Sequence, residues 1–285
     1  MSRPEDGKSG MSRADADAPA RRRARPEGGS PSTASAAEIA VEGLAIGYGS
    51  YVVLDDLAFE VQRGDVFVIM GGSGSGKSTL LRHLMGLDEP LRGDIRHRGL
   101  SLNHGTAEER RQIARRFGVL FQSGALWSSM TLEENVMLPI VELAGLPRED
   151  AQTLARMKLA LVGLKGFEHL YPSELSGGMQ KRAALARAIA LDPELLFLDE
   201  PSAGLDPPTT RHIDELILEL RESLGVTLVV VTHELQSILR IGTNGILIDA
   251  ASRKIIARGN PRELHTTSAD ARVHDFLGHG TEGAP

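Results

Sequence analysis

The amino-acid sequence predicts an α/β fold that is built on a largely parallel β-sheet. Two observations carry this prediction. Short apolar runs, which are typical of buried strands, alternate with helical patterns along most of the chain. One of these runs, residues 66–70, leads through a glycine-rich turn into an amphipathic segment at 80–85. A long helical stretch between two strands, at about residues 123–192, predicts an inserted α-helical subdomain.

The composition is that of an ordinary globular protein and excludes several classes of function. The chain has 285 residues, of which 41% are hydrophobic and 25% are charged. Its formal net charge of −6 gives no indication of a nucleic-acid partner. Because the chain has no cysteine, it has neither disulfide bonds nor thiolate metal sites. No apolar run approaches the roughly 18 residues of a membrane span, so work at a membrane requires other subunits that cross it.

The two ends of the chain are predicted to be tails. Residues 1–37 have no hydrophobic period and are predicted to be disordered. The arginine cluster at 21–25 is more typical of a solvated charge run than of a lipid-binding segment. No apolar segment follows it, as a signal peptide would require. The main domain is predicted at 38–277, and 278–285 are predicted to be a flexible tail.

The N-terminal half of the domain is expected to start with strands and to continue with helices. Glycine-rich turns separate the first three apolar runs, and glycine or proline interrupts the long helical stretch. Strands are expected at 39–46, 52–61, 66–70, 94–98 and 117–121, and helices at 106–116 and over 131–192, with breaks at 145–147 and 171–172.

The C-terminal half alternates strands and helices. The apolar runs at 195–198 and 226–232 predict buried strands, and the helical spacing of apolar residues at 210–224 predicts an amphipathic helix between them. A strand pair at 245–249 and 254–257 is expected to precede a short helix at 261–264.

The turn after residues 66–70 has the pattern of a phosphate-binding loop. Its backbone N–H groups can converge on phosphate oxygens because glycines carry no Cβ, and the next helix adds the positive end of its dipole. Lys77 suits the β- and γ-phosphates of a nucleotide, and the Ser78 hydroxyl suits Mg²⁺. The candidate nucleotide-binding residues are Gly71, Gly72, Ser73, Gly74, Ser75, Gly76, Lys77, Ser78 and Thr79.

Two further segments carry residues that can bind a metal or an anion or take part in catalysis. The apolar strand at 195–198 ends in Asp199 and Glu200, and an aspartate at such a strand end holds Mg²⁺ in phosphate-loop proteins. Glu200 is then placed to polarise the water that attacks the γ-phosphate. Residues 176–178, Ser-Gly-Gly, open a helix, where they are either a simple cap or a second anion site. Because the chain already has one phosphate loop, such a site can serve the nucleotide of another copy.

Taken together, these motifs resemble those of ABC-transporter ATPase subunits. Residues 175–180, Leu-Ser-Gly-Gly-Met-Gln, are similar to the signature sequence of that family. They lie between the phosphate loop and the strand that ends in Asp199 and Glu200. The other landmarks follow in the family's order. Gln122 matches the Q-loop glutamine, Ser202–Asp206 match the D-loop, and His233 matches the switch histidine. The resemblance covers about residues 38–276.

This resemblance implies a phosphate-loop NTPase core of the ABC ATPase type, with a mostly parallel sheet, an antiparallel β subdomain and the inserted helical subdomain. It implies ATP hydrolysis, with ATP and Mg²⁺ as cofactors, in a dimer whose two copies face head to tail. Tyr48 matches the aromatic residue that stacks on adenine, with Tyr51 as the second candidate. The implied catalytic residues are Glu200, His233 and Gln122, the metal ligands are Ser78, Gln122 and Asp199, and the further nucleotide contacts are Ser176, Gly177, Gly178 and Asp206.

The resemblance is closest to ATPases of MCE-type lipid transporters, the lipid-asymmetry (Mla-type) system that acts between the two bacterial membranes. It rests on residues 121–127 and 130–136, and on two further sequence segments at 172–179 and 272–277. It implies a phospholipid cargo and a place at the cytoplasmic side of the inner membrane. The implied partners are an integral membrane permease docked near Gln122, an MCE-domain protein and a small STAS-domain protein.

Two alternatives stay open. The first keeps the fold and changes the cargo to an amino acid, an ion or another solute. The second is a soluble ABC protein that acts on ribosomes or DNA, which the lack of a second cassette and of any heptad run disfavours. Trp127 is either a docking residue or part of the core.

Overall fold

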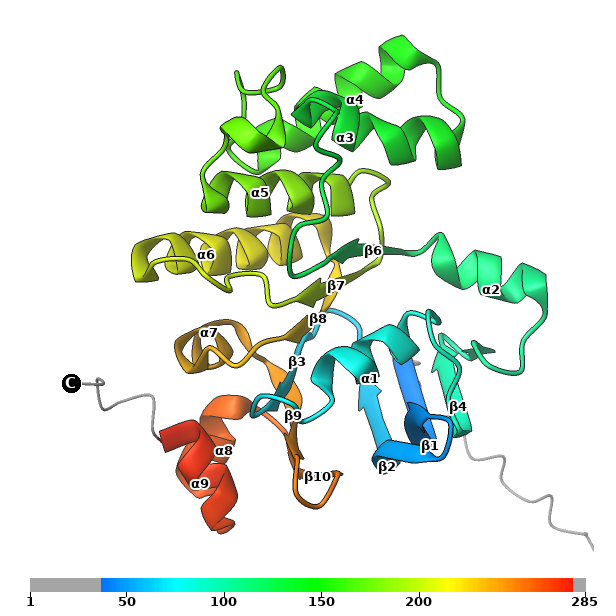
Figure 1. The fold of residues 1–285 in the computed structure, drawn as a ribbon, viewed down its shortest axis with the longest axis vertical. Helices are drawn as coiled ribbons and strands as arrows, with labels where there is room; N and C mark the ends of the chain where they lie inside the picture. The colour runs from blue at the N-terminus through cyan, green and yellow to red at the C-terminus, as the bar shows by residue number, and fades with distance from the viewer. Residues whose placement is uncertain (1–36, 279–285) are drawn as a thin grey trace, which may run out of the picture. The chain divides into compact units, whose positions relative to one another are not determined.

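The computed structural model describes residues 37–278, whose strands form two sheets (Figure 1). One sheet has the strand order β2-β1-β4-β5, and the other has the order β10-β9-β3-β8-β7-β6. The predicted disordered tail, apart from Ala37, lies outside the described residues, as do residues 279–285 of the predicted C-terminal tail.

The four-stranded sheet is antiparallel and confirms the expected β subdomain. β1 (Ile39–Tyr48) and β2 (Tyr51–Val61) form a hairpin, and β4 (Arg92–His97) pairs with the other side of β1. The two-residue strand β5 (Leu100–Ser101) extends the sheet beyond β4. Buried and more exposed residues mix along β1 and β2, as in a sheet with one face on the core.

The six-stranded sheet is mostly parallel, as the sequence predicts. All its neighbouring pairs are parallel except β9 with β10. β3 and β8 are buried along their whole length, which explains why they are continuous apolar runs. The strands are β3 (Val66–Gly71), β6 (Phe117–Leu120), β7 (Leu195–Asp199), β8 (Thr227–Val231), β9 (Asn244–Asp249) and β10 (Lys254–Arg258).

Helices cover both faces of the six-stranded sheet. The side chains of β7 alternate: Leu196 and Leu198 pack in one hydrophobic cluster, and Leu195 and Phe197 pack in another. The first cluster lies under α5 (Gly177–Ala188) and α6 (Pro207–Leu224), which run side by side (Figure 1). The second cluster is shared with α1 (Lys77–Leu84) and the four-stranded sheet. A third cluster, around Val68, lies under α7 (Leu235–Ile241), α8 (Pro261–Thr267) and α9 (Ala271–Gly278).

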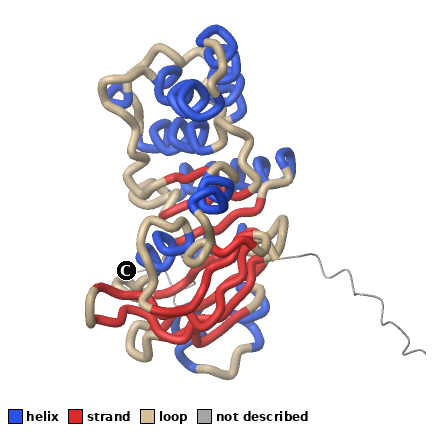
Figure 2. Tube along the Cα trace, turned by 90° about the vertical axis from the view of Figure 1, so that its right-hand side faces the viewer, coloured by secondary structure: helices blue, strands red, loops and turns tan. Residues whose placement is uncertain are grey.

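The helical subdomain forms one end of the described residues, on the side of β6 (Figures 1 and 2). It contains α3 (Leu132–Pro139), a π-helix (Ile140–Ala144), α4 (Arg148–Leu161), a short 3₁₀ turn (Pro172–Glu174) and α5. The widened π turn follows Pro139, which has no N–H to donate to the preceding turn. α2 (Ala107–Ala114) leads from the antiparallel sheet towards β6.

Three details differ from the sequence-based prediction. Residues 162–170 are not helical, because Gly163 and Gly166 adopt φ values of +70° and +92° that end a right-handed helix. α7 and α9 were not predicted, since segments of seven and eight residues are too short to show a clear period. β5 was missed for the same reason. Within residues 37–278, no helix combines the length and the apolar character that crossing a membrane requires.

Candidate active site

The phosphate loop connects the end of β3 to the start of α1, as the sequence predicts. The loop requires glycine at two positions, where its backbone lies too close to neighbouring atoms for a Cβ to fit. A Cβ on Gly71, at φ +154°, would lie 2.6 Å from Ser75 Oγ and 2.7 Å from the Ile248 carbonyl oxygen. A Cβ on Gly76, at φ +92°, would lie 2.8 Å from a methyl carbon of Val53. The loop therefore keeps its backbone close to β2 and β9.

Lys77, the first residue of α1, folds back over this loop. Its ammonium donates hydrogen bonds of 2.9 Å to the carbonyl oxygens of Gly71 and Gly72, and the residue is only 7% exposed. Burial lowers the pKa of Lys77, whereas the nearby negative charges of Glu200 and Asp199 raise it. One buried cation thus contacts the loop and lies near both carboxylates.

Ser78 and Asp199 bring a hydroxyl next to a carboxylate. Ser78 Oγ donates to Asp199 Oδ1 at 3.2 Å, which joins the start of α1 to the end of β7. Burial raises the pKa of the Asp199 carboxyl, and the bond from Ser78 opposes that shift. In the described part of the chain, no cluster of three or more His, Asp or Glu side chains could hold a metal. A hydroxyl and one carboxylate nevertheless suit Mg²⁺, which usually takes a few protein oxygens and completes its shell with phosphate and water.

Glu200 and His233 meet at the ends of β7 and β8. His233 Nδ1 lies 2.8 Å from Glu200 Oε1, and Glu200 itself is 7% exposed. The second oxygen of this carboxylate, Oε2, is buried and has no hydrogen-bond partner among residues 37–278. Glu200 also has a φ of +48°, a left-handed conformation that is uncommon for a residue with a side chain. An orphan buried carboxylate oxygen on a strained backbone is typical of a functional position.

One cavity of about 670 Å³ collects most of the predicted residues. Its lining contains the phosphate loop from Gly72 to Thr79, together with Gln122, Glu200 and His233. Tyr51 and Val53 of β2 also line it, and the sequence-based analysis missed Val53. Tyr48 lies directly opposite Tyr51 in the β1–β2 pair and is 57% exposed, but it is not in this lining.

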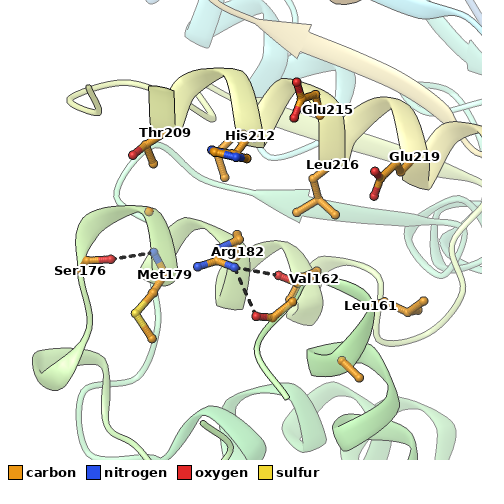
Figure 3. A pocket seen from close by; sticks show the side chains of 14 residues that line it. Leu161, Val162, Ser176, Met179, Arg182, Thr209, His212, Glu215, Leu216 and Glu219 are labelled. Carbon is orange, nitrogen blue, oxygen red and sulfur yellow. Dashed lines mark hydrogen bonds between the residues drawn. The ribbon is translucent and has the colours of Figure 1, made fainter. Parts of the chain in front are cut away.

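Ser176, Gly177 and Gly178 lie elsewhere, at the start of α5. Ser176 Oγ accepts a hydrogen bond from the Met179 N–H, which is the predicted N-cap. A Cβ on Gly178 would lie 2.6 Å from the Thr209 side chain, so α5 packs closely against α6. Ser176 and Gly178 line a cavity of about 560 Å³ between these helices, in which Ser176 and Met179 lie opposite Thr209 and His212 (Figure 3).

Asp206 has a local structural partner. Its carboxylate accepts hydrogen bonds from the Thr209 N–H at 3.3 Å and the Thr209 hydroxyl at 2.6 Å, which caps α6. The bond from the Thr209 side chain lowers the pKa of Asp206. Asp206 is outside the lining of the phosphate-loop cavity.

An apolar groove of about 470 Å³ adjoins the site on the side of the helical subdomain. β6, the π-helix and the end of α5 contribute to it, with the exposed side chains of Phe121, Trp127 and Leu143. Trp127 is 57% exposed and therefore does not belong to the core. Leu126, its neighbour, is partly buried and packs against the main hydrophobic cluster instead.

Comparisons with known proteins agree with this geometry. The ABC transporter family profile matches residues 54–203. An intermembrane phospholipid transport system ATP-binding protein, MlaF, from Haemophilus influenzae is 42% identical over 245 residues, which cover 86% of this chain and 92% of that protein. A probable ribonucleotide transport ATP-binding protein, mkl, from Mycobacterium tuberculosis is 40% identical over 84% of this chain, but the match spans only 66% of the length of that relative.

The fold has matches among solved structures as well. One is an ATP-binding cassette solved as a dimer in a post-hydrolysis state bound to ADP and Pi. It superposes with a TM-score of 0.70 and 30% identity, over 78% of this chain and 98% of that chain. The phosphate loop, the Glu200–His233 pair, the family match and this likeness together show that the chain belongs to the ABC transporter family, as one of its ATP-binding cassettes.

Proposed function

We propose that this chain is the ATP-hydrolysing subunit of an ABC transporter that moves phospholipid, of the MCE or Mla type. The observation that carries the proposal is the single cavity that joins the phosphate loop to Gln122, Glu200 and His233. The cargo rests on the MlaF relative, which is matched over 92% of its length.

In this function the phosphate loop holds the nucleotide. The backbone N–H groups between Gly72 and Thr79 bind phosphate oxygens, and Lys77 exchanges its carbonyl partners for the β- and γ-phosphates. Tyr51 is the better-placed of the two tyrosines for the adenine, because it lines the cavity, while Tyr48 remains the candidate from the family motif.

Ser78, Asp199 and Gln122 would hold Mg²⁺. The ion, when bound, supplies positive charge that offsets the charge on the phosphates. The support from the chain is the oxygen-donor character of these side chains and the short distance between Ser78 and Asp199.

Glu200 orients and polarises the water that attacks the γ-phosphorus. The water oxygen forms a bond to phosphorus as the bond to the β-γ bridging oxygen breaks, and ADP leaves. His233 restrains one carboxylate oxygen and so holds the carboxylate in place at the end of β7. The geometry thus favours positioning and electrostatics over a covalent intermediate.

Two copies are needed to complete each site. Ser176 and Gly178 line a cavity separate from their own phosphate loop, so this segment, with Gly177, is available to the nucleotide of a second copy. Asp206 bonds Thr209, which lines the same cavity. The dimeric cassette that resembles this chain supports a head-to-tail pair.

The apolar groove beside Trp127 is the docking site for a helix of an integral membrane permease. An exposed tryptophan in an apolar groove, next to Gln122, suits an anchor for a partner side chain. An MCE-domain protein and a small STAS-domain protein complete the assembly at the cytoplasmic side of the inner membrane. No nucleic acid is a partner.

The test is purification of the assembled complex and its reconstitution into lipid nanodiscs with an MCE-domain partner. ATP hydrolysis and lipid transfer should both depend on phospholipid. The mkl relative points to a second candidate cargo, a ribonucleotide. If a ribonucleotide, an amino acid or an ion stimulates ATP hydrolysis and phospholipid does not, the proposed phospholipid cargo is wrong. The assignment as an ATPase would still hold.

A further inference from the structure

Lys181 of α5 is a buried cation that the known motifs leave without a role. It is 7% exposed, and its ammonium donates hydrogen bonds to two backbone carbonyl oxygens, those of Gln122 and Glu200. The bond to Glu200 measures 3.0 Å. Burial lowers the pKa of Lys181, but the charges of Glu200 and Asp199 oppose this shift.

The two carbonyl groups belong to the two segments that must be aligned for hydrolysis. Gln122 follows β6, and Glu200 follows β7, so Lys181 ties together two neighbouring strand ends. Glu200 has the left-handed φ of +48°, a strained conformation that persists only where its surroundings hold it. The bond from Lys181 is one of those restraints, together with the Ala203 N–H, which donates to the same carbonyl at 3.2 Å.

α5 holds the loop after Gln122 at a second point. The Arg187 guanidinium donates to the carbonyl oxygens of Gly124 at 2.9 Å and Ala125 at 2.6 Å. Trp127 then continues the same loop into the apolar groove. The loop from Gln122 to Trp127 is therefore fastened to one helix by two cations, six residues apart in the chain.

The other end of that helix carries Ser176 and Gly178. Lys181 lies five residues after Ser176, which is about 7.5 Å along the helix axis. The Ser176 cap and Lys181 therefore belong to one continuous helix.

From these contacts we infer that Lys181 is a positioning residue, which sets the placement of the Glu200 carboxylate and of Gln122 according to the position of α5. Contact of Ser176 with the nucleotide of a second copy moves α5, and Lys181 transmits this movement to the site of its own copy. The effect on hydrolysis rests on the proposed function. The two hydrogen bonds by which Lys181 clamps Gln122 and Glu200 are a property of this chain.

The experiment compares Lys181→Met with Lys158→Met in the full chain purified with its membrane partners. Lys158 is a matched control, because it is 5% exposed, lies on α4 of the same subdomain and pairs with Asp192. For Lys181→Met, kcat should fall about ten- to a hundredfold, as expected for a misplaced catalytic group. KM and the affinity for a fluorescent ATP analogue should stay within about twofold, because Lys181 is not in the cavity lining. Lys181→Arg, which keeps the charge and the donors, should recover part of kcat.

Amide hydrogen exchange is the second readout and requires no turnover. Residues 123–131 and 201–203 should exchange faster in Lys181→Met than in Lys158→Met at equal global stability. Unchanged exchange together with a kcat close to wild type would overturn the inference, as would an equal loss of kcat in both variants. If the wild-type complex hydrolyses no ATP, the proposed function fails, and the exchange comparison still decides whether Lys181 clamps the two segments.

Discussion

At the scale of single residues, the candidate site depends on charged side chains that are buried. Glu200 is buried on a strained backbone, with one carboxylate oxygen beside His233 and the other without a partner among the described residues. Lys77 is buried as well and bonds only carbonyl oxygens of the loop among the side-chain hydrogen bonds of residues 37–278. Replacing Glu200 should therefore lower the rate of hydrolysis, whereas replacing Lys77 should lower the affinity for the nucleotide.

Replacing Glu200 with glutamine should leave nucleotide affinity nearly unchanged and lower kcat by at least about a hundredfold. The amide keeps the shape of the side chain but lacks the negative charge that polarises the water in the proposed mechanism. Steady-state hydrolysis and binding of a fluorescent ATP analogue measure the two effects separately.

Lys77→Ala is the contrasting variant. It removes the cation that is proposed to bind two phosphates, so it should weaken analogue binding itself. Equal affinity in Lys77→Ala and Glu200→Gln, or turnover near wild type in Glu200→Gln, would contradict the assigned roles.

His97 makes the stability of the fold depend on pH. It is 3% exposed, its Nε2 lies 2.9 Å from the Leu84 carbonyl oxygen, and burial lowers its pKa to about 4. The unfolded chain takes up the proton near pH 6.5, so stability is full above this value and is lost as the pH falls towards 4. At pH 5 the free energy of unfolding should be about 2 kcal/mol lower than at pH 7 on account of this residue.

Denaturant unfolding between pH 5 and 7 measures this effect. His97→Gln keeps a hydrogen-bond donor but cannot titrate, so most of the slope should disappear. The exposed His104 offers a matched control. His104→Gln should retain the slope, and a slope that survives in His97→Gln would rule out His97 as its source.

At the scale of elements, the connection between β6 and α3 links the site to the apolar groove. Asn135 of α3 holds the far end of this loop: its Oδ1 accepts from the Trp127 N–H at 2.8 Å, and its Nδ2 donates to the carbonyls of Trp127, Met130 and Thr131. A buried asparagine thus fixes the backbone of Trp127 while the indole stays exposed. Such an arrangement presents an apolar side chain at little entropic cost on binding.

Trp127→Ala should weaken association with the permease by about 2 kcal/mol or more, which is roughly thirtyfold in Kd. Nucleotide affinity should be unchanged, because Trp127 is not in the lining of the phosphate-loop cavity. Co-purification yield and a titration of detergent-solubilised permease measure the loss.

Met157 on α4 provides the control, since it is 58% exposed and lies outside the groove. Met157→Ala should bind the permease as the wild type does. Equal binding by Trp127→Ala would show that the groove has another occupant. Leu126 is unsuitable for the test, because its truncation would disturb the core.

At the scale of the whole molecule, the separation of the phosphate loop from the segment Ser176–Gly178 argues for a dimer. The phosphate loop and the Ser176 segment line different cavities, so one nucleotide in one copy does not touch both. Two copies that face each other head to tail bring each loop to the Ser176 segment of the other.

Ser176→Arg, placed in the Glu200→Gln background, should prevent the ATP-dependent dimer. The bulky cation replaces a small exposed residue at the expected contact. Size-exclusion chromatography with light scattering, with and without ATP, gives the mass directly. Thr131→Arg is the control, since Thr131 caps α3 in the same manner but belongs to a different surface. A dimer that forms equally in both variants would contradict the head-to-tail arrangement.

Much of the fold follows from local patterns in the sequence. The phosphate loop, the strand that ends in Asp199 and Glu200, and the Ser176 cap are all contiguous, and each depends on the preferences of fewer than ten residues. Alternation of strands with helices was enough to predict the parallel sheet, which the structure confirms. The non-helical stretch at 162–170 was missed, because the positive φ angles of its two glycines depend on how α4 and α5 must be connected.

By itself, the sequence determined which residues are the candidates to bind phosphate, metal and water, because those motifs are local and their chemistry needs particular residue types at short spacing. Only the tertiary structure decided which of them share a cavity, which tyrosine lines it, and that Trp127 is exposed while Leu126 is packed. It also revealed Lys181, whose bonds reach Gln122, 59 residues away, and Glu200, 19 residues away. Contacts of that separation arise from the packing of α5 against the strand ends, and no local pattern encodes them.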